Sequence, residues 1–324
     1  MFSYRSLLKQ AWEITWKHKY LWFFGLFASL VAGGGSWEYQ LLTQNVNQGL
    51  VDGSYFRLSS ILVLGELAKN FGLGLIDLFQ SDFLIILNGL SVIIITAAIL
   101  AFFIWLAISS QAALVDNIKK IADKKKKALG LSIRSGLTAG NNYFWPLLGL
   151  NIIIKVLVAA AFFLVSLPLL FMVMSDTPTL AVIYTILFVI FVPVAVSLSL
   201  MIKYAIGYNV LDNKSFTASL QFAHRLFKKN WLVSVEMAVI IFLINFLASG
   251  IVLVALSLFL LPLLLLGLIM QLNWLAVLIM FLAITIIIVF GSALTTFQTS
   301  SWTILFLKLK EGGAAAKLER IFRR

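Results

Sequence analysis

The sequence contains no cysteine and only two histidines, His18 and His224. The absence of cysteine excludes a disulfide framework, thiolate zinc sites, iron–sulfur ligation and a cysteine nucleophile. Both histidines lie in polar segments beside cationic residues, without the neighbouring carboxylate–histidine group that catalysis or metal binding needs. Charge is scarce too, because 12% of the 324 residues are charged and 61% are hydrophobic. A soluble domain cannot cover its surface with so few charges, so the composition indicates a membrane protein.

Several apolar runs reach the roughly 20 residues that a helix needs to cross the hydrocarbon core. The six expected spans are 20–37, 83–110, 143–173, 178–208, 231–266 and 273–306. The first is the shortest and ends in three glycines at 33–35, so a cleaved signal peptide is its alternative interpretation. The long amphipathic region before it lacks a clear small-residue cleavage site, which favours a retained span.

The basic residues are distributed in a pattern typical of cytoplasmic loops. Segments 1–19, 111–142, 203–230 and 307–324 carry 22 of the 25 lysines and arginines, whereas the alternate loops are acidic. Because lysine and arginine accumulate on the cytoplasmic side, this bias predicts six spans with both termini in the cytoplasm. The expected location is the cytoplasmic membrane of the cell. The net charge of +12 is therefore explained by topology, and we expect no nucleic-acid partner.

Three stretches share one junction, in which a polar amphipathic segment is followed by an apolar run. They read KHKYLW from position 17, GNNYFW from position 140 and KKNWLV from position 228. Before the first junction, Tyr4, Leu7, Leu8, Ala11, Trp12 and Trp16 recur at helical spacing opposite basic positions. Such a helix is typical of the membrane interface, with the junction aromatics at headgroup level. We call this segment an elbow helix.

The junctions supply most of the predicted headgroup contacts. These candidates are Lys19, Tyr20, Trp22, Asn142, Tyr143, Trp145, Lys229, Asn230 and Trp231, together with the basic cluster Lys124, Lys125, Lys126 and Lys127. Lysine clusters next to a span attract anionic headgroups of the cytoplasmic leaflet, and they also determine topology.

The predicted fold is an all-α polytopic bundle of six transmembrane helices, built from three repeats of an elbow helix plus a two-helix hairpin. The expected boundaries are 1–110 for the first repeat with an exterior loop at 38–82, 111–208 for the second with a basic cytoplasmic loop, 209–306 for the third and 307–324 for a basic cytoplasmic tail. The similar stretches LVDN from position 114 and VLDN from position 210 support the second and third repeats.

Three elbow-plus-hairpin units with this polar–aromatic entry resemble the membrane domain of bacterial glycerophosphoryl diester phosphodiesterases and related stand-alone six-helix proteins. The resemblance covers nearly the whole chain, although its motif is short. The phosphodiesterase domain of that family is absent here, and so are the carboxylate and histidine clusters that it would need. The resemblance therefore implies a membrane module that handles or senses lipid-related material, and no catalytic residue.

Four polar residues are expected inside the spans. Lys155 is the sharpest candidate, with Asn151 one turn earlier on the same helix. Glu236 is the only acid expected in a span, and Asn245 lies closer to the depth of Lys155. Since a charge near the bilayer centre costs about 2.5–3.5 kcal/mol, Lys155 should face the bundle or a watery cavity. The alternative is that Lys155 is satisfied by helix carbonyls and Asn151 and has only a structural role.

Two functions are compatible with these features. The first is a non-enzymatic integral membrane module that binds anionic lipid through its elbows or assembles with a membrane partner or another copy of itself. The alternative is a transporter or channel for a lipid-like or small polar solute that uses Lys155. We expect no enzyme, cofactor or metal site, because no catalytic set is visible.

Overall fold

A computed structural model describes residues 3–32, 69, 83–123, 132–175 and 179–312. Within these ranges every regular element is an α-helix. The chain divides into two compact units, of which unit 1 comprises Met1–Val31, Ala107–Ile152 and Leu198–Arg324. Unit 2 comprises Ala32–Leu106 and Ile153–Ser197.

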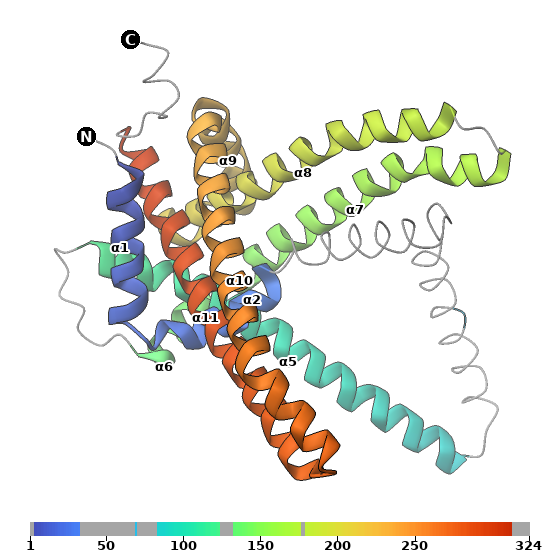
Figure 1. Cartoon of the computed structure of the whole chain (residues 1–324). Coiled ribbons are helices and arrows are strands. Elements are labelled where there is room, and N and C mark those ends of the chain that lie inside the picture. Colours follow the sequence, from blue (N-terminus) through green and yellow to red (C-terminus); the bar gives the residue numbers. More distant parts are fainter. Residues whose placement is uncertain (1–2, 33–68, 70–82, 124–131, 176–178, 313–324) are drawn as a thin grey trace. The chain divides into compact units, whose positions relative to one another are not determined.

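The helices follow one another as the apolar runs predict (Figure 1). Their bounds are α1 Tyr4–Lys17, α2 Leu21–Ala32, α5 Phe83–Ala122, α6 Ile133–Asn141, α7 Phe144–Ser175, α8 Thr179–Asp212, α9 Phe216–Lys229, α10 Trp231–Ile269 and α11 Asn273–Lys310. The three predicted elbow helices are thus helical, as α1, α6 and α9. Each of the three junctions lies immediately before or at the start of the next helix, at Leu21, Phe144 and Trp231.

Five helices are long and apolar enough to cross a membrane, which indicates a multi-pass membrane protein. The qualifying segments are Ile86–Ala122, Phe144–Val165, Val182–Asp212, Trp231–Ile269 and Asn273–Lys310. The sixth expected span is described only as the shorter helix α2, because residues 33–37 lie outside the described residues. Six spans, and the repeat built on them, therefore stay predictions. The exterior loop 38–82, apart from Lys69, also lies outside the described residues, as do 313–324 of the tail.

Two helices extend past their predicted ends, α5 by about three turns and α8 by about one turn. The run expected to stop at residue 110 continues as α5 to Ala122, because Ala112, Ala113 and Ile118 are buried and keep the helix packed. The span expected to end at residue 208 continues as α8 to Asp212, so the first part of the basic segment 203–230 is helical and Lys203 lies inside the helix.

The long helices change character along their length. In α11 large apolar side chains are exposed from Trp274 to Val289, whereas all residues from Gly291 to Leu309 are buried or half-buried. In α8 the exposed stretch ends near Ser197, and most later residues are buried. These exposed stretches of roughly 16 to 19 residues are roughly 24 to 28 Å long at 1.5 Å per residue. Those lengths are close to the hydrocarbon core of about 30 Å, so each helix has one lipid-length segment and one packed segment.

The packed segments form the core of unit 1. Helix α2 lies so close to α11 that a Cβ atom on Gly25 would overlap the Ser292 carbonyl. Likewise, a Cβ atom on Gly140 of α6 would overlap the Ser109 carbonyl of α5. Fully buried Phe24 fills the space beside Gly136 of α6. Small residues at these crossings let helix backbones approach closely, as in other membrane helix pairs.

Unit 2 holds the remaining segments of α5, α7 and α8. Its described side chains are mainly exposed and apolar, as in Ile94 at 65% and Leu164 at 62%. Tyr184 and Phe188 stack one turn apart along α8, with their ring centroids separated by 5.7 Å. A surface of this kind is typical of contact with lipid.

Candidate membrane-interface site

One face of helix α1 packs against the other helices of unit 1. Leu7, Ala11 and Ile14 are buried where α1 packs along α11. At its first residue the Tyr4 hydroxyl donates a 2.5 Å hydrogen bond to a carboxylate oxygen of Glu236 on α10. This bond satisfies the only acid in the described part of α10, so α1 is fixed to α10 as well as to α11.

The rest of α1 faces outward. Trp12 is 55% exposed and Trp16 is 45% exposed, and their ring centroids are 5.4 Å apart. Arg5 and Lys9 are exposed on the same side of the helix. The predicted apolar stripe is therefore only partly covered by protein. Leu7 and Ala11 are buried, whereas Trp12 and Trp16 contact Phe297 and Trp22 and stay exposed beside the basic residues.

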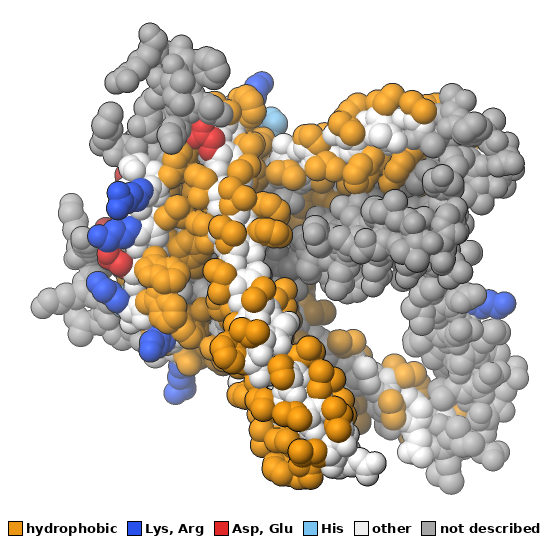
Figure 2. Space-filling model, in the orientation of Figure 1, with side chains coloured by type: hydrophobic (Ala, Val, Ile, Leu, Met, Phe, Trp, Pro, Cys, Tyr) orange, Lys and Arg blue, Asp and Glu red, His pale blue; other side chains and the backbone are white. Residues whose placement is uncertain are grey.

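The space-filling view shows this arrangement on one face of the molecule (Figure 2). Lysine and arginine side chains gather over α1, whereas hydrophobic side chains cover the visible parts of α10 and α11. Tryptophan next to lysine or arginine is the combination that lies at a membrane–water interface. We call the end of unit 1 that carries α1, α6, α9 and the C-terminal ends of α5, α8 and α11 the basic end.

At the first junction the aromatic side chains are turned inward. The indole N–H of Trp22 donates a 2.9 Å hydrogen bond to the Thr15 carbonyl, which ties α2 to the end of α1. Burial raises the pKa of Tyr20 to about 12, and its hydroxyl has no partner among the described residues. Burial, followed by the charge of Lys17, lowers the pKa of His18. Lys19 is exposed, so it is the junction residue that a headgroup can reach.

The second junction is divided between an inward tyrosine and an outward tryptophan. The Tyr143 hydroxyl donates a 2.5 Å hydrogen bond to the side-chain oxygen of Asn213, while Trp145 is 75% exposed. Burial and then the Asp116 carboxylate raise the pKa of Tyr143, and Lys120 opposes them. Asn142 is exposed beside Trp145.

The third junction resembles the second in presenting an exposed tryptophan. Trp231 is 56% exposed at the start of α10, and Lys229 before it is exposed. Between them Asn230 donates from its side chain to the Leu226 carbonyl at 3.1 Å, and its own carbonyl accepts from Ser234 at 2.9 Å. Asn230 thus joins α9 to α10 at the turn, whereas the side chains of Lys229 and Trp231 are exposed on the surface.

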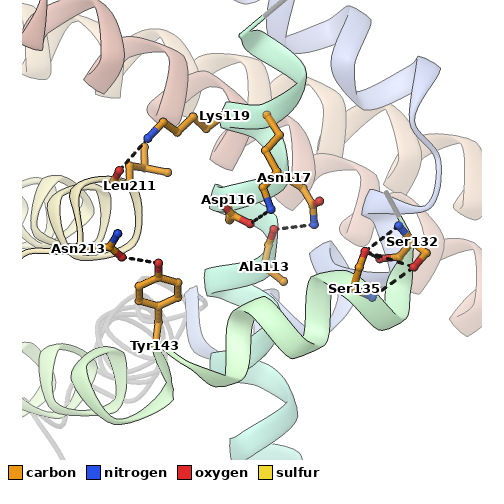
Figure 3. A network of polar contacts seen from close by, with 10 residues as sticks. Ala113, Asp116, Asn117, Lys119, Ser132, Ser135, Tyr143, Leu211 and Asn213 are labelled. Atoms are coloured by element: carbon orange, nitrogen blue, oxygen red, sulfur yellow. Dashed lines mark hydrogen bonds and ion pairs between the residues drawn. The ribbon is translucent and has the colours of Figure 1, made fainter. Parts of the chain in front are cut away.

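A polar network joins the helix ends at the second junction (Figure 3). Lys119 of α5 reaches the Leu211 carbonyl of α8 at 2.7 Å, where a cation is favourable at a helix C-terminus. Asn213 follows α8 with a φ of 52°, a left-handed conformation that asparagine tolerates after a helix. From this position it accepts the Tyr143 bond, so the starts and ends of three helices are fixed together.

The similar stretches around Asp116 and Asp212 behave differently. Asp116 pairs with Lys120 one turn later in α5 at 2.6 Å, because α5 continues past it. Asp212 ends α8 and pairs with Lys310 of α11 at 2.7 Å. The second pair links two helices, which sequence similarity alone did not indicate.

The four intramembrane candidates differ in burial and in their hydrogen bonds. Asn151 is buried and donates to Gln111 at 3.0 Å and to the Leu147 carbonyl at 2.8 Å. Lys155, one turn further along α7, is exposed. Asn245 is half-buried, and its side-chain oxygen has no partner among the described residues.

One basic residue, Lys203, lies both in the expected span 178–208 and in the basic segment 203–230, and it was not singled out as a site candidate. Lys203 lies in α8 with its ammonium nitrogen 4.4 Å from the ring centroid of Trp302 on α11. The apolar run that continues from Tyr204 to Leu211 is the signal that the helix extends through it. The cluster Lys124–Lys127 lies outside the described residues.

The described residues contain no group of three or more histidines and acids placed to hold a metal ion. No family model, no curated protein and no solved structure matches the chain. The resemblance to the membrane domain of glycerophosphoryl diester phosphodiesterases therefore stays a prediction. The physical evidence for function is the surface chemistry of the basic end.

Proposed function

We propose that the chain is a non-enzymatic membrane module whose basic end contacts anionic lipids of the cytoplasmic leaflet. The observation that carries this proposal is the outward face of α1, where Trp12 and Trp16 are exposed beside Arg5 and Lys9. Indole rings partition to the headgroup level, and each nearby lysine or arginine attracts anionic lipid by about 1 kcal/mol. In this proposal the protein lies in the cytoplasmic membrane, and its basic end faces the cytoplasm.

The length of the helices supports this placement. Helix α11 has an exposed segment of nearly the length of the hydrocarbon core, and Trp12 of α1 contacts Phe297 in the segment that follows it. The first turn of α11 beyond the apolar segment lies in the headgroup layer, which is about 5–7 Å thick on each side, so a helix docked there has part of its length in that layer. The exposed Trp145 and Trp231 at the starts of α7 and α10 are chemically suited to the same region.

The transport alternative has less support from the described contacts. Transport through Lys155 requires polar side chains that line a common pathway with it. The two N–H donors of Asn151 are instead bonded to Gln111 and to the Leu147 carbonyl. Glu236 is bonded to Tyr4 of α1. These bonds are typical of interhelical contacts that hold a bundle together.

The proposal can be tested in nanodiscs that contain the full chain, phosphatidylcholine and a minor fraction of spin-labelled phosphatidylglycerol. We expect the native chain to enrich phosphatidylglycerol in the motionally restricted fraction. Each of the variants R5Q and K9Q should lower that enrichment by up to about 5-fold at low salt, which corresponds to about 1 kcal/mol. Glu13 is exposed on the same helix, so E13Q is the matched control and should keep or increase the enrichment. Equal enrichment by R5Q, K9Q and E13Q would contradict lipid binding and favour a protein partner at this face.

A further inference from the structure

Lys203 is an exposed cation in a helix that otherwise runs through apolar surroundings. It follows the exposed segment of α8 by six residues, or about 9 Å at 1.5 Å per residue. A lysine stem can extend from that depth to the headgroup layer that borders the hydrocarbon core. No acidic side chain of the described residues forms an ion pair with Lys203. Its charge therefore has no protein counter-ion in the described part of the chain.

The ammonium group is nevertheless held in place. Its nitrogen lies 4.4 Å from the centroid of the Trp302 ring, a distance typical of a cation–π contact. Trp302 is only 7% exposed, and Tyr204 packs edge-on against it with ring centroids 6.4 Å apart. The Tyr204 hydroxyl shares a 2.7 Å hydrogen bond with Ser234 of α10, so α8, α10 and α11 together fix the aromatic seat.

A cation–π contact uses one side of an ammonium group and leaves its other N–H donors free. A lysine ammonium has three donors and no acceptor, so the partner it lacks is an anion. Basic sites between transmembrane helices at the depth of the headgroups take lipid phosphates.

We infer that Lys203, seated on Trp302, is a specific binding site for the phosphate of an anionic phospholipid headgroup. The inference rests on the proposed function, which it deepens by assigning one ordered lipid in addition to the general enrichment around α1.

The chain offers a matched control. Lys155 is likewise an exposed lysine in an apolar helix, but it lies in α7 and none of the cation–π contacts of the described residues involves it. A neutral substitution at Lys155 removes the same charge from the membrane region without touching the aromatic seat. The variant K203R keeps the charge and the ability to stack on indole.

The experiment is native mass spectrometry of the full chain, released from phosphatidylcholine nanodiscs that contain phosphatidylglycerol. We expect the native chain, K203R and K155Q to retain one phosphatidylglycerol molecule. K203Q should weaken its retention by about 5-fold or more, as the concentration series of phosphatidylglycerol measures. Thermal stability of each variant in lipid-free detergent shows that K203Q is folded, because an exposed side chain contributes little to the core.

Three results would overturn the inference. The first is equal retention by K203Q and the native chain, and the second is an equal loss in K155Q, which would mean a general charge effect. The third is stabilisation by inorganic phosphate in detergent, dependent on Lys203, without any retained phosphatidylglycerol, which would mean a soluble phosphate ligand. The α1 variants R5Q and K9Q should leave the single retained lipid in place. Full retention in K203Q with normal enrichment around α1 would mean that this inference alone fails. Loss of retention in K203Q without enrichment around α1 would mean that the proposed function fails.

Discussion

Replacing Gly140 by alanine is expected to destabilise the packing of α6 on α5. A Cβ atom at this position would overlap the backbone carbonyl oxygen of Ser109, and a backbone atom cannot turn aside as a side chain can. Gly25 meets the Ser292 carbonyl of α11 in the same way. Gly250 and Gly291 have open space around the corresponding position, so they are matched controls within α10 and α11.

The magnitude follows from two opposing effects. Alanine is favoured over glycine in a helix by about 1 kcal/mol, and this gain applies at all four positions. At Gly140 and Gly25 the Cβ atom would lie 2.1 and 2.3 Å from a carbonyl oxygen, so the helices must also separate by roughly 1.2–1.4 Å to restore a contact distance of about 3.5 Å. Overpacking of this kind costs about 1–3 kcal/mol. We therefore expect G140A and G25A to be less stable than G250A and G291A by about 1–3 kcal/mol.

The assay is reversible unfolding of the full chain in mixed micelles, with increasing sodium dodecyl sulfate and helix content measured by circular dichroism. The two control variants should unfold at the same detergent fraction as the native chain or at a slightly higher one. G140A and G25A should unfold earlier. If G140A were as stable as G250A, the close approach of α6 to Ser109 would be refuted.

Three further predictions concern side chains at the basic end. Y20F should keep or raise the free energy of unfolding, because the Tyr20 hydroxyl is buried without a partner among the described residues; a clear loss of stability in the same unfolding assay would show that a partner exists. Burial and Lys17 lower the pKa of His18 below its ordinary value of 6.5, so the unfolded chain binds the proton more readily. Stability should therefore fall as the pH drops below about 6.5, and H18Q should reduce that slope when unfolding is measured from pH 7.5 to 5. The ion pair of Asp212 with Lys310 is partly exposed, so a double-mutant cycle of D212N and K310Q should give a coupling below about 1 kcal/mol that decreases in high salt; a larger, salt-independent coupling would contradict this exposure.

Most of the helical structure could be predicted from hydropathy and spacing. The starts of α7 and α10 agree with their predicted positions to within one residue, and α11 starts at the predicted residue, because Asn142, Asn230 and Asn273 mark where each long apolar run begins. The C-terminal ends were less predictable. Helix α5 continues to Ala122 and α8 to Asp212, since tertiary packing buries small and polar residues that sequence alone assigns to loops.

The candidate site was predictable in its residue types but not in the direction of its side chains. Helical spacing placed Trp12 on one stripe with Leu7, yet packing on α11 buries Leu7 and leaves Trp12 exposed. Likewise Tyr20 resembled Trp231 in the sequence, but Tyr20 turns inward and Trp231 does not. Periodicity identifies a face, and only the neighbouring helices decide which part of that face is covered.

The placement of α1 in the headgroup layer is the central claim, and the absence of cysteine makes a direct measurement possible. Single cysteines at positions 12, 13 and 14 can be spin-labelled in the full chain and examined by power saturation in nanodiscs of phosphatidylcholine and phosphatidylglycerol. We expect a label at Trp12 to be accessible to oxygen and protected from a water-soluble nickel chelate. A label at Glu13 should be accessible to the chelate, and one at Ile14 should be protected from both reagents. Equal chelate access at positions 12 and 13 would mean that α1 stands in water, and it would contradict the proposed contact with lipid.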